Sequence, residues 1–438
     1  MSEPKILTVG PLSMDFQDGE LRYLRAGREE LLRRVYFSVR DEAWGTVIPD
    51  IVGLKIDQRP DGFTVSYQGR CQTGTLDFSY SVMIDGFFPG DVTIRTSGRL
   101  LMPSQARRFG LCAHMGARAV CGRPFAAVSG SPRESVFPDM IDQVILAEYL
   151  PGLSYTTASG AVVQVTIHGG QFGLEDQRHF GDSSFKLFSD MPYAYPTVND
   201  LSEHWQEVRV TSRFPDRFPQ PFIDPDQIDV GAEPIDQSIP VLNTQESTAK
   251  PTFFLDSWLA RAEWKDRKIV SWDFDPSVNL YDNETLGENL AVLCDQANTV
   301  RSLAAGSVHR LGRVSHRPTV RHPHDPFQPG WVLAAVKAIA AAGIGEASFQ
   351  GLSVESKRLL AELGEWAGAA LLPVHLSSDD SQSGKRRYEA LAFVRKGQVM
   401  VYLANLTDEP LVLSLSLPAG QSMTIGFQGY GLCRLGPP

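Results

Sequence analysis

Apolar and polar residues alternate along most of the first half of the chain. The alternation is clear over residues 63–67 (FTVSY) and 76–84 (LDFSYSVMI), and the turn sequence PDG at 60–62 precedes the first of these runs. A period of two places successive side chains on opposite faces of a β-strand, so each run has one apolar face. Many such runs joined by short turns predict an antiparallel β-sandwich over residues 1–213.

This pattern stops at residues 214–251. The segment is rich in proline and aspartate and shows no regular hydrophobic period. Proline removes a backbone donor and favours extended or turn conformations over helices and central strands. We therefore predict a linker, or a strap that lies on the protein surface.

Strand and helix patterns then alternate over residues 252–370. Predicted strands lie at 268–274, 308–315 and 347–350, and predicted helices lie at 285–305, 331–342 and 354–367. Thr285 and Glu288 have the spacing of a capping box at the start of the first helix. This alternation predicts parallel strands with right-handed crossovers. About three strand–helix units fit in this segment, so it can form only part of a (β/α) barrel, which has eight.

Residues 371–438 return to a period of two, most clearly at 399–403 and 411–417, which predicts a small C-terminal β domain. The predicted fold class is thus multidomain α+β. An open barrel would expose strand edges, which need a cover. The sandwich, the segment 258–264 or a second subunit would provide one, so a homodimer is a possible assembly.

Composition narrows the classes of partner. The chain has 438 residues, enough for two or three domains, and a net charge of −10 from 41 basic and 51 acidic residues. An acidic chain without a basic stripe argues against nucleic acid or an anionic membrane as partner. No apolar stretch is long enough to span a membrane, and no signal peptide is evident. The five cysteines form no CxxC pair, which favours reduced thiols in the cytoplasm.

The densest group of charged residues lies at 172–190, directly after a predicted strand. Its candidate catalytic residues are Glu175, Asp176, Arg178, His179, Asp182 and Lys186. Loops at strand ends often carry catalytic groups. A carboxylate beside cations has a lowered pKa and is a weaker base, so the catalytic base would have to be a carboxylate buried away from them. A salt-bridged surface hairpin explains the same residues equally well.

The sandwich offers a second group of candidates, which would bind a sugar. Its members are Arg40, Asp41, Trp44, Arg108 and His114. An exposed tryptophan would stack on the C–H groups of a sugar while the charged side chains bind its hydroxyls. The alternative is a tryptophan in the sandwich core with an Arg–Asp pair at a strand end.

The barrel-like segment offers fewer candidates. Asp273 lies at the carboxyl end of a predicted parallel strand, where barrel enzymes place functional groups. His316, His322, His324 and Asp325 form a cluster, but its prolines favour a solvated loop over a metal site. We find no GxSxG, HExxH, GxxxxGK[ST] or GxGxxG signature. The sequence therefore predicts no metal and no cofactor.

Several of these motifs resemble one family. YFSVRDEAWGT at 36–46, RFGLC at 108–112, CGRP at 121–124 and LEDQRHFGDSSFK at 174–186 resemble the N-terminal β domain of D-apionate lactonases. NETLGENL, GWVLAAVKAIAAAG and LANLTDEP resemble the later half of the family's barrel and its C-terminal β domain. The resemblance implies a supersandwich-like β domain, a (β/α) barrel and hydrolysis of apionolactone to apionate in sugar catabolism.

Two departures from the family pattern bear on activity. Family members are considerably longer, and the proline-rich segment at 214–251 stands where the front half of the barrel is expected. His179, Phe180 and Gly181 stand where the family pattern leads us to expect Asn, Trp and Thr, and His114 is one position out of register. A shift of one residue on a strand turns a side chain to the opposite face.

Three functions remain open from the sequence. The first is hydrolysis of a sugar-acid lactone, with Glu175, Asp176 or Asp182 as base and nearby cations as stabilisers. The second is a carbohydrate-binding protein or pseudoenzyme that lost catalysis with the barrel. The third is a glycoside hydrolase, which needs two carboxylates across a groove, for example Asp273 and one from 172–190.

Overall fold

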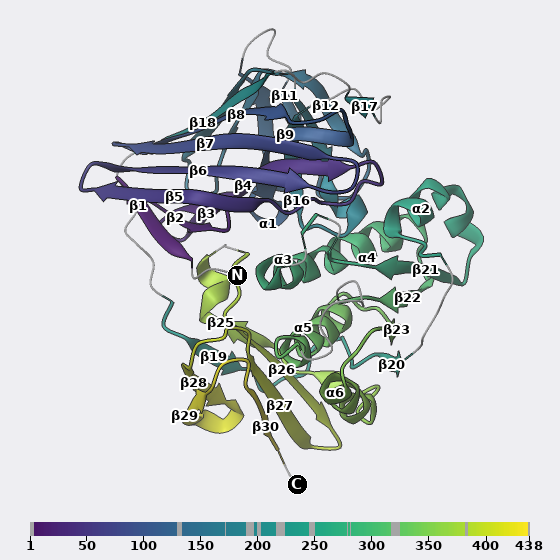
Figure 1. The fold of residues 1–438 in the computed structure, drawn as a ribbon. Coiled ribbons are helices and arrows are strands. Elements are labelled where there is room, and N and C mark those ends of the chain that lie inside the picture. Colours follow the sequence, from purple (N-terminus) through teal and green to yellow (C-terminus); the bar gives the residue numbers. More distant parts are fainter. Residues whose placement is uncertain are drawn as a thin grey trace. The chain divides into compact units, whose positions relative to one another are not determined.

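The computed structural model describes residues 4–128, 134–170, 172–189, 197–198, 203–215, 224–244, 250–277, 279–280, 282–316, 325–381 and 384–436. The chain divides into two compact units. Unit 1 contains Met1–Asp176, Ser184–Ile223 and Ser381–Gly384, and unit 2 contains Gln177–Ser183, Asp224–Asp380 and Lys385–Pro438. Figure 1 gives the positions of their elements along the chain.

Unit 1 contains two large antiparallel sheets, which we call sheet A and sheet B. In spatial order, sheet A consists of β1 (Lys5–Val9), β2 (Leu12–Gln17), β3 (Glu20–Ala26), β4 (Glu29–Asp41), β9 (Ser104–Gly116), β16 (Ser184–Ser189), β15 (Phe172–Asp176) and β12 (Ile145–Leu150), with β17 (Thr197–Val198) also paired to β9. A four-residue helix, α1 (Ala117–Val120), follows β9.

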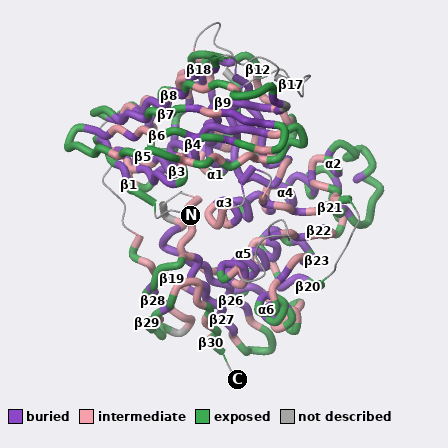
Figure 2. The backbone as a smooth tube through the Cα atoms, viewed as in Figure 1, coloured by how far each residue is buried: buried purple, intermediate pink, exposed green. Residues whose placement is uncertain are grey.

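Sheet B has nine strands. In spatial order they are β11 (Glu134–Val136), β10 (Pro124–Ala127), β13 (Gly152–Thr156), β14 (Val162–His168), β18 (His204–Arg213), β8 (Asp91–Leu100), β7 (Asp77–Phe87), β6 (Gly62–Gln72) and β5 (Asp50–Arg59). Buried positions alternate with more exposed ones along much of β6 and β7, as Figure 2 shows. The period of two seen in the sequence therefore marks two chemically different faces of one sheet.

The apolar faces of the two sheets share one hydrophobic core. Phe109 and Leu111 of β9 belong to the same buried cluster as Phe78 and Val82 of β7. A fully buried phenylalanine contributes about 2 kcal/mol to stability, so this cluster is the main stabilising feature of unit 1. The prediction of an antiparallel β-sandwich is confirmed.

Unit 2 contains the three predicted parallel strands, β21 (Ile269–Phe274), β22 (Val308–Val314) and β23 (Glu346–Phe349), and a fourth strand, β20 (Val241–Thr244), that the sequence did not predict. They pair in the order β20, β23, β22 and β21, all parallel. The helices are α2 (Phe254–Leu259), α3 (Asn283–Glu288), α4 (Val292–Leu303), α5 (Gln328–Ala341) and α6 (Val354–Gly364), with 3-10 turns η2 (Arg261–Asp266) and η3 (Asn289–Ala291). The described strands form an open sheet whose edge strand β21 contacts α2.

The start of α3 differs from the prediction. Thr285 is not the N-cap, because Asp282 occupies that position and its side chain accepts a hydrogen bond from the Thr285 backbone N–H at 2.8 Å. Aspartate is as good a capping residue as threonine, and here it lies three residues earlier. The predicted pairing with Glu288 is therefore wrong.

The proline-rich segment 214–251 contributes strands to two sheets, although its sequence has no period. β19 (Gln227–Val230) pairs with β25 (Val374–Leu376) and β28 (Leu411–Leu417), whereas β20 joins the parallel sheet. The remaining C-terminal strands are β24 (Ala370–Leu371), β26 (Tyr388–Arg395), β27 (Gln398–Asn405), β29 (Gln421–Phe427) and β30 (Leu432–Leu435). Together with β19, β25 and β28 they form two four-stranded sheets, in the orders β25–β19–β28–β29 and β24–β26–β27–β30, and the two sheets share a buried apolar core.

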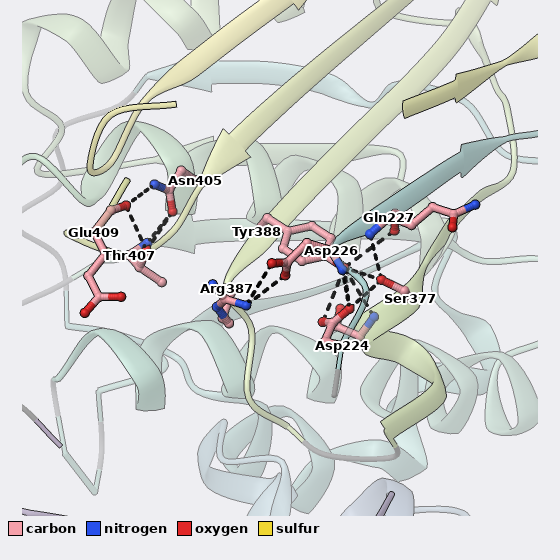
Figure 3. A network of polar contacts seen from close by, with 10 residues as sticks. Asp224, Asp226, Gln227, Ser377, Arg387, Tyr388, Asn405, Thr407 and Glu409 are labelled. Atoms are coloured by element: carbon pink, nitrogen blue, oxygen red, sulfur yellow. Dashed lines mark hydrogen bonds and ion pairs between the residues drawn. The ribbon is translucent and has the colours of Figure 1, made fainter. Parts of the chain in front are cut away.

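A polar network anchors the beginning of this segment to the C-terminal strands (Figure 3). The Tyr388 hydroxyl lies 2.7 Å from Ser377 Oγ and donates to Asp224 at 3.1 Å, and Arg387 binds Asp226 at 2.8 Å. Burial raises the pKa of Tyr388 to about 12, so the hydroxyl remains protonated. These contacts satisfy polar groups that burial would otherwise penalise.

Among the described residues, no helix is long and apolar enough to cross a membrane.

Candidate active site on sheet A

The strands of sheet A have one apolar and one polar face. In β9, Phe109, Leu111, Ala113 and Met115 enter the sandwich core, so the alternate residues, among them His114, lie on the other face. The same alternation holds in β4 and β16. The face that points away from the core therefore carries the polar side chains of these strands, and candidate catalytic groups lie there.

Strand register brings six polar residues into one row on that face. Direct cross-strand partners join Asp15 of β2, Arg22 of β3, Arg34 of β4, His114 of β9, Lys186 of β16 and Glu175 of β15. We call this set the polar row. All six are buried, with at most 7% of any residue exposed. Buried charges are costly unless they are paired, so such a row is unusual for a purely structural sheet.

Hydrogen bonds and ion pairs order one end of the polar row. Lys186 Nζ lies 3.4 Å from Glu175 Oε2, and His114 Nδ1 is hydrogen-bonded to Ser184 Oγ at 2.9 Å. The row contains three permanent or potential cations and two carboxylates besides the imidazole. Its local charge is therefore positive although the whole chain is acidic.

An apolar row lies beside the polar row, formed by Tyr36, Cys112 and Phe188. Arg108 lies over the Phe188 ring, with Cζ 4.2 Å from the ring centroid, and Lys186 Nζ lies 5.9 Å from it. The ring has room because Gly173 is its cross-strand partner, where a Cβ would lie 2.8 Å from Cζ of Phe188. Two cations thus lie within cation–π distance of one aromatic ring.

The polar face changes the protonation of its titratable groups. Burial, with help from Arg108 and Arg40 against the opposing effect of Glu175, lowers the pKa of Lys186 from 10.5 to about 8. Burial and the nearby Arg34 and Lys186 hold the pKa of His114 well below 6.5. At neutral pH the imidazole is therefore uncharged, while the lysine is charged but close to its titration range.

Tyr36 adds a neutral donor to this face. Burial raises its pKa to about 12, so it remains a phenol at neutral pH. Its hydroxyl is buried and has no hydrogen-bond partner among the described residues. Buried hydroxyls usually have a partner, so this one is suited to a bound ligand.

Three of the predicted catalytic residues belong to unit 2. Arg178 donates to Asp295 at 3.2 Å, and Asp182 accepts from Asn279 at 2.6 Å. The His179 ring packs edge-on against Trp258, with centroids 4.9 Å apart. These residues lie in η1 (Gln177–Phe180) and the loop after it, and these contacts hold the loop within unit 2.

Of the other predicted catalytic residues, Glu175 and Lys186 lie together in the polar row, whereas Asp176 does not. Asp176 is fully buried at the end of β15 and follows the core residue Leu174 by two positions. It therefore lies on the core side of sheet A, opposite Glu175.

The predicted sugar-binding residues of unit 1 lie on sheet A and in the turn that follows β4. Arg40 and Arg108 are cross-strand partners, and Trp44 is 41% exposed with the Arg108 Cζ 5.7 Å from its ring centroid. Asp41 accepts from the backbone N–H groups of Ala43 and Gly45, at 2.9 and 2.7 Å. Its side chain thus stabilises the turn that presents Trp44.

Asp273 and the histidine cluster lie in unit 2. Asp273 accepts from the Thr252 backbone N–H at 2.9 Å and lies 3.4 Å from Arg313. His316 packs on Trp331, whereas His322 and His324 lie outside the described residues. Within the described ranges, no three His, Cys, Asp or Glu residues are placed to hold a metal ion.

Sequence reasoning missed Arg34, Tyr36, Phe188 and Ser184 on this face. A signal for two of them was present: in RRVYFSVR at 33–40, Arg34, Tyr36 and Arg40 alternate with apolar residues. That alternation predicts a strand with one apolar face and one face that carries polar side chains.

Comparison with known proteins agrees with the sequence motifs. Residues 1–214 match the family described as D-apionate lactonase, N-terminal domain. The D-apionate lactonase of Brucella anthropi is 29% identical over 213 residues, which cover 47% of this chain and 35% of that protein. The matched region thus spans about a third of the length of that relative.

Solved structures give weaker likenesses. A putative aldose 1-epimerase from Escherichia coli K12 is 10% identical, covers 49% of this chain and 99% of its own, and has a TM-score of 0.33. A β-arabinopyranosidase is 9% identical, covers 99% of this chain and 98% of its own, and has a TM-score of 0.32. These TM-scores are too low to establish a shared fold. The sequence match is more informative: residues 1–214 of this chain are similar to the D-apionate lactonase N-terminal domain.

Proposed function

We propose that this chain hydrolyses a sugar-acid lactone on the polar face of sheet A. The observation that carries the proposal is the buried Lys186–Glu175 pair, 3.4 Å apart, in a row with Arg34 and His114. The match of residues 1–214 to the D-apionate lactonase N-terminal domain supports this class of substrate. Apionolactone, the substrate that the family resemblance implies, is the first candidate.

The apolar and polar rows suit the two sides of a lactone. The C–H face of the lactone would lie against the apolar row, beside Phe188, because apolar and aromatic side chains favour such contacts. Arg108 lies over the Phe188 ring and Arg34 lies in the adjoining row, so both would interact with the carbonyl oxygen as it becomes negative. Arginine remains charged at any working pH and donates in a fixed geometry, which suits an oxyanion.

Glu175 and Lys186 would move the protons. Glu175 accepts a proton from a water molecule, whose oxygen attacks the lactone carbonyl carbon. The tetrahedral intermediate then collapses, the ring C–O bond breaks, and Lys186 donates a proton to the leaving alkoxide. A proton returns from Glu175 to Lys186 across their 3.4 Å contact, and the new carboxylic acid loses its proton to solvent.

The lowered pKa of Lys186 favours this assignment. An acid with a pKa of about 8 donates a proton at neutral pH more readily than one at 10.5. Among the three candidate bases, Glu175 lies on the face that carries these cations. Asp176 lies on the core side, and Asp182 is hydrogen-bonded to Asn279 in unit 2.

Lactone hydrolysis in a pH-stat tests the proposal, with apionolactone and a set of aldonolactones as substrates. We expect Glu175→Gln and Lys186→Met each to lower kcat/KM by roughly 10²-fold or more with the fold retained. The matched controls are Glu148→Gln and Lys357→Met, at exposed positions of β12 and α6. Turnover in the variants equal to that of the parent would remove the polar row from catalysis.

A comparison of lactone turnover with lactone binding distinguishes an enzyme from a protein that only binds its ligand. The family match covers 35% of its relative, which keeps a binding-only function as the second candidate. If the parent protein is inert on every lactone but lactones raise its Tm, the polar face binds without turnover. In that case Tyr36→Phe would weaken binding, because its unpartnered hydroxyl is suited to the ligand.

A further inference from the structure

Sheet B carries a trough on the face that points away from the sandwich core. Its volume is about 580 Å³, within the range of small-ligand sites in proteins. Ser66, Ser81 and Ser97 form its floor, on the neighbouring strands β6, β7 and β8. Small hydroxyl side chains on three adjacent strands leave a depression there, and Ser81 donates to the Ser97 carbonyl at 3.3 Å.

Trp205 lines one end of the trough and is 51% exposed. It is the cross-strand partner of Ser97, so its ring borders the serine floor. Gly169 holds the ring in place, because a Cβ there would lie 2.3 Å from Cε3 and 2.7 Å from Cζ3 of the indole. The opposite edge of the indole, which carries Nε1, therefore points away from Gly169.

The charges at the trough are balanced. Arg95 binds Asp85 at 2.9 Å and Glu207 at 2.8 Å, and Lys55 lies at the far side of the floor. Two cations thus face two carboxylates, so the trough favours neither sign of ligand charge. This separates it from the positively charged polar face of sheet A.

We propose that this trough binds a neutral saccharide. Sugar rings have an apolar C–H face and a rim of hydroxyls. The indole of Trp205 and the Met83 side chain match the first, and the serine floor with Gln68 matches the second. Met83 is 46% exposed, so the trough presents apolar surface that water solvates poorly. The site is separate from the proposed lactone site, since it lies on the other sheet.

Isothermal titration calorimetry on the full chain tests the site, with cellohexaose and xylohexaose as neutral probes. We expect millimolar or tighter binding that Trp205→Ala weakens by at least about tenfold, because stacking on the indole is lost. Phe87→Ala is the matched control. Phe87 lies on the same face of β7, is 49% exposed and does not line the trough.

Gly169→Ala gives a second variant that keeps every tryptophan. The added Cβ would lie 2.2 Å from the Trp205 carbonyl oxygen and 2.3 Å from Cε3 of its indole, so Trp205 must move and saccharide binding should weaken. Gly169 also has a φ of +81°, so the Tm is measured to report the loss of stability from backbone strain. Lactone hydrolysis should be the same in Trp205→Ala as in the parent, so the two proposals fail separately.

Three results would overturn the inference. These are no heat with either saccharide, equal binding by Trp205→Ala and the parent, or a change of sedimentation coefficient in Trp205→Ala, which would make the trough a protein-association surface.

Discussion

The buried pair of Lys186 and Glu175 makes a testable prediction about stability. Lys186→Met removes the titrating ammonium group and keeps a side chain of similar length. In the parent, burial lowers the pKa of Lys186 from 10.5 to about 8, so the folded state disfavours the charged form. The variant should therefore lose a pH dependence that the parent has.

The size of the effect follows from the pKa. A fall from 10.5 to about 8 corresponds to a cost of about 3 kcal/mol for holding the proton in the folded state. Below pH 8 both states bind the proton and the full cost is present. Between pH 8 and 10.5 the unfolded state binds more protons, so the free energy of unfolding rises with pH. Above that window the cost is gone.

Urea denaturation at several pH values from 7 to 10.5 measures this rise. The difference in unfolding free energy between the parent and Lys186→Met should increase by about 3 kcal/mol over that window. Lys186→Arg, which stays charged, and the exposed Lys357→Met serve as controls. A flat difference would mean that the pKa of Lys186 is not lowered, and the proposed role of Lys186 as proton donor would lose its basis.

Two further predictions concern stability in unit 2. Tyr388→Phe should lower the free energy of unfolding by about 1–2 kcal/mol, because it removes a buried hydroxyl that binds Ser377 and Asp224 (Figure 3). Chemical denaturation checks this against the exposed Tyr149→Phe, and equal stability would make the network unimportant. Asp282→Ala should cost about 1 kcal/mol through loss of the α3 cap, and Asp282→Ser should restore most of it. If serine and alanine behave alike in thermal denaturation, the cap is not what stabilises this helix start.

Part of the candidate site could be predicted from the sequence. Glu175, Lys186, Arg108 and His114 are among the residues that charge density and motif spacing single out, and all four lie on the polar face of sheet A. The loop at 178–182 is as dense in charge, yet its contacts lie within unit 2. The density of charged residues along the chain therefore does not predict which of them lie on the sheet face and which belong to the neighbouring loop.

Elements and faces followed from the sequence because they depend on local periods. A period of two marked the sandwich strands, and alternating strand and helix patterns marked the parallel sheet of unit 2. The local α3 cap was still misplaced by three residues, since Asp282 and Thr285 are both good caps.

Only the tertiary structure decided which of these faces gathers the buried polar side chains. The polar row spans six strands, and its members come from residues 15 to 186. The strand order β4–β9–β16–β15 and its register arise from pairing between distant segments, driven by burial of the shared apolar core. The trough on sheet B depends on the same long-range pairing of Ser81, Ser97 and Trp205. Periodicity determines which side of its own strand a residue faces, whereas its neighbours on that face depend on how the whole sheet assembles.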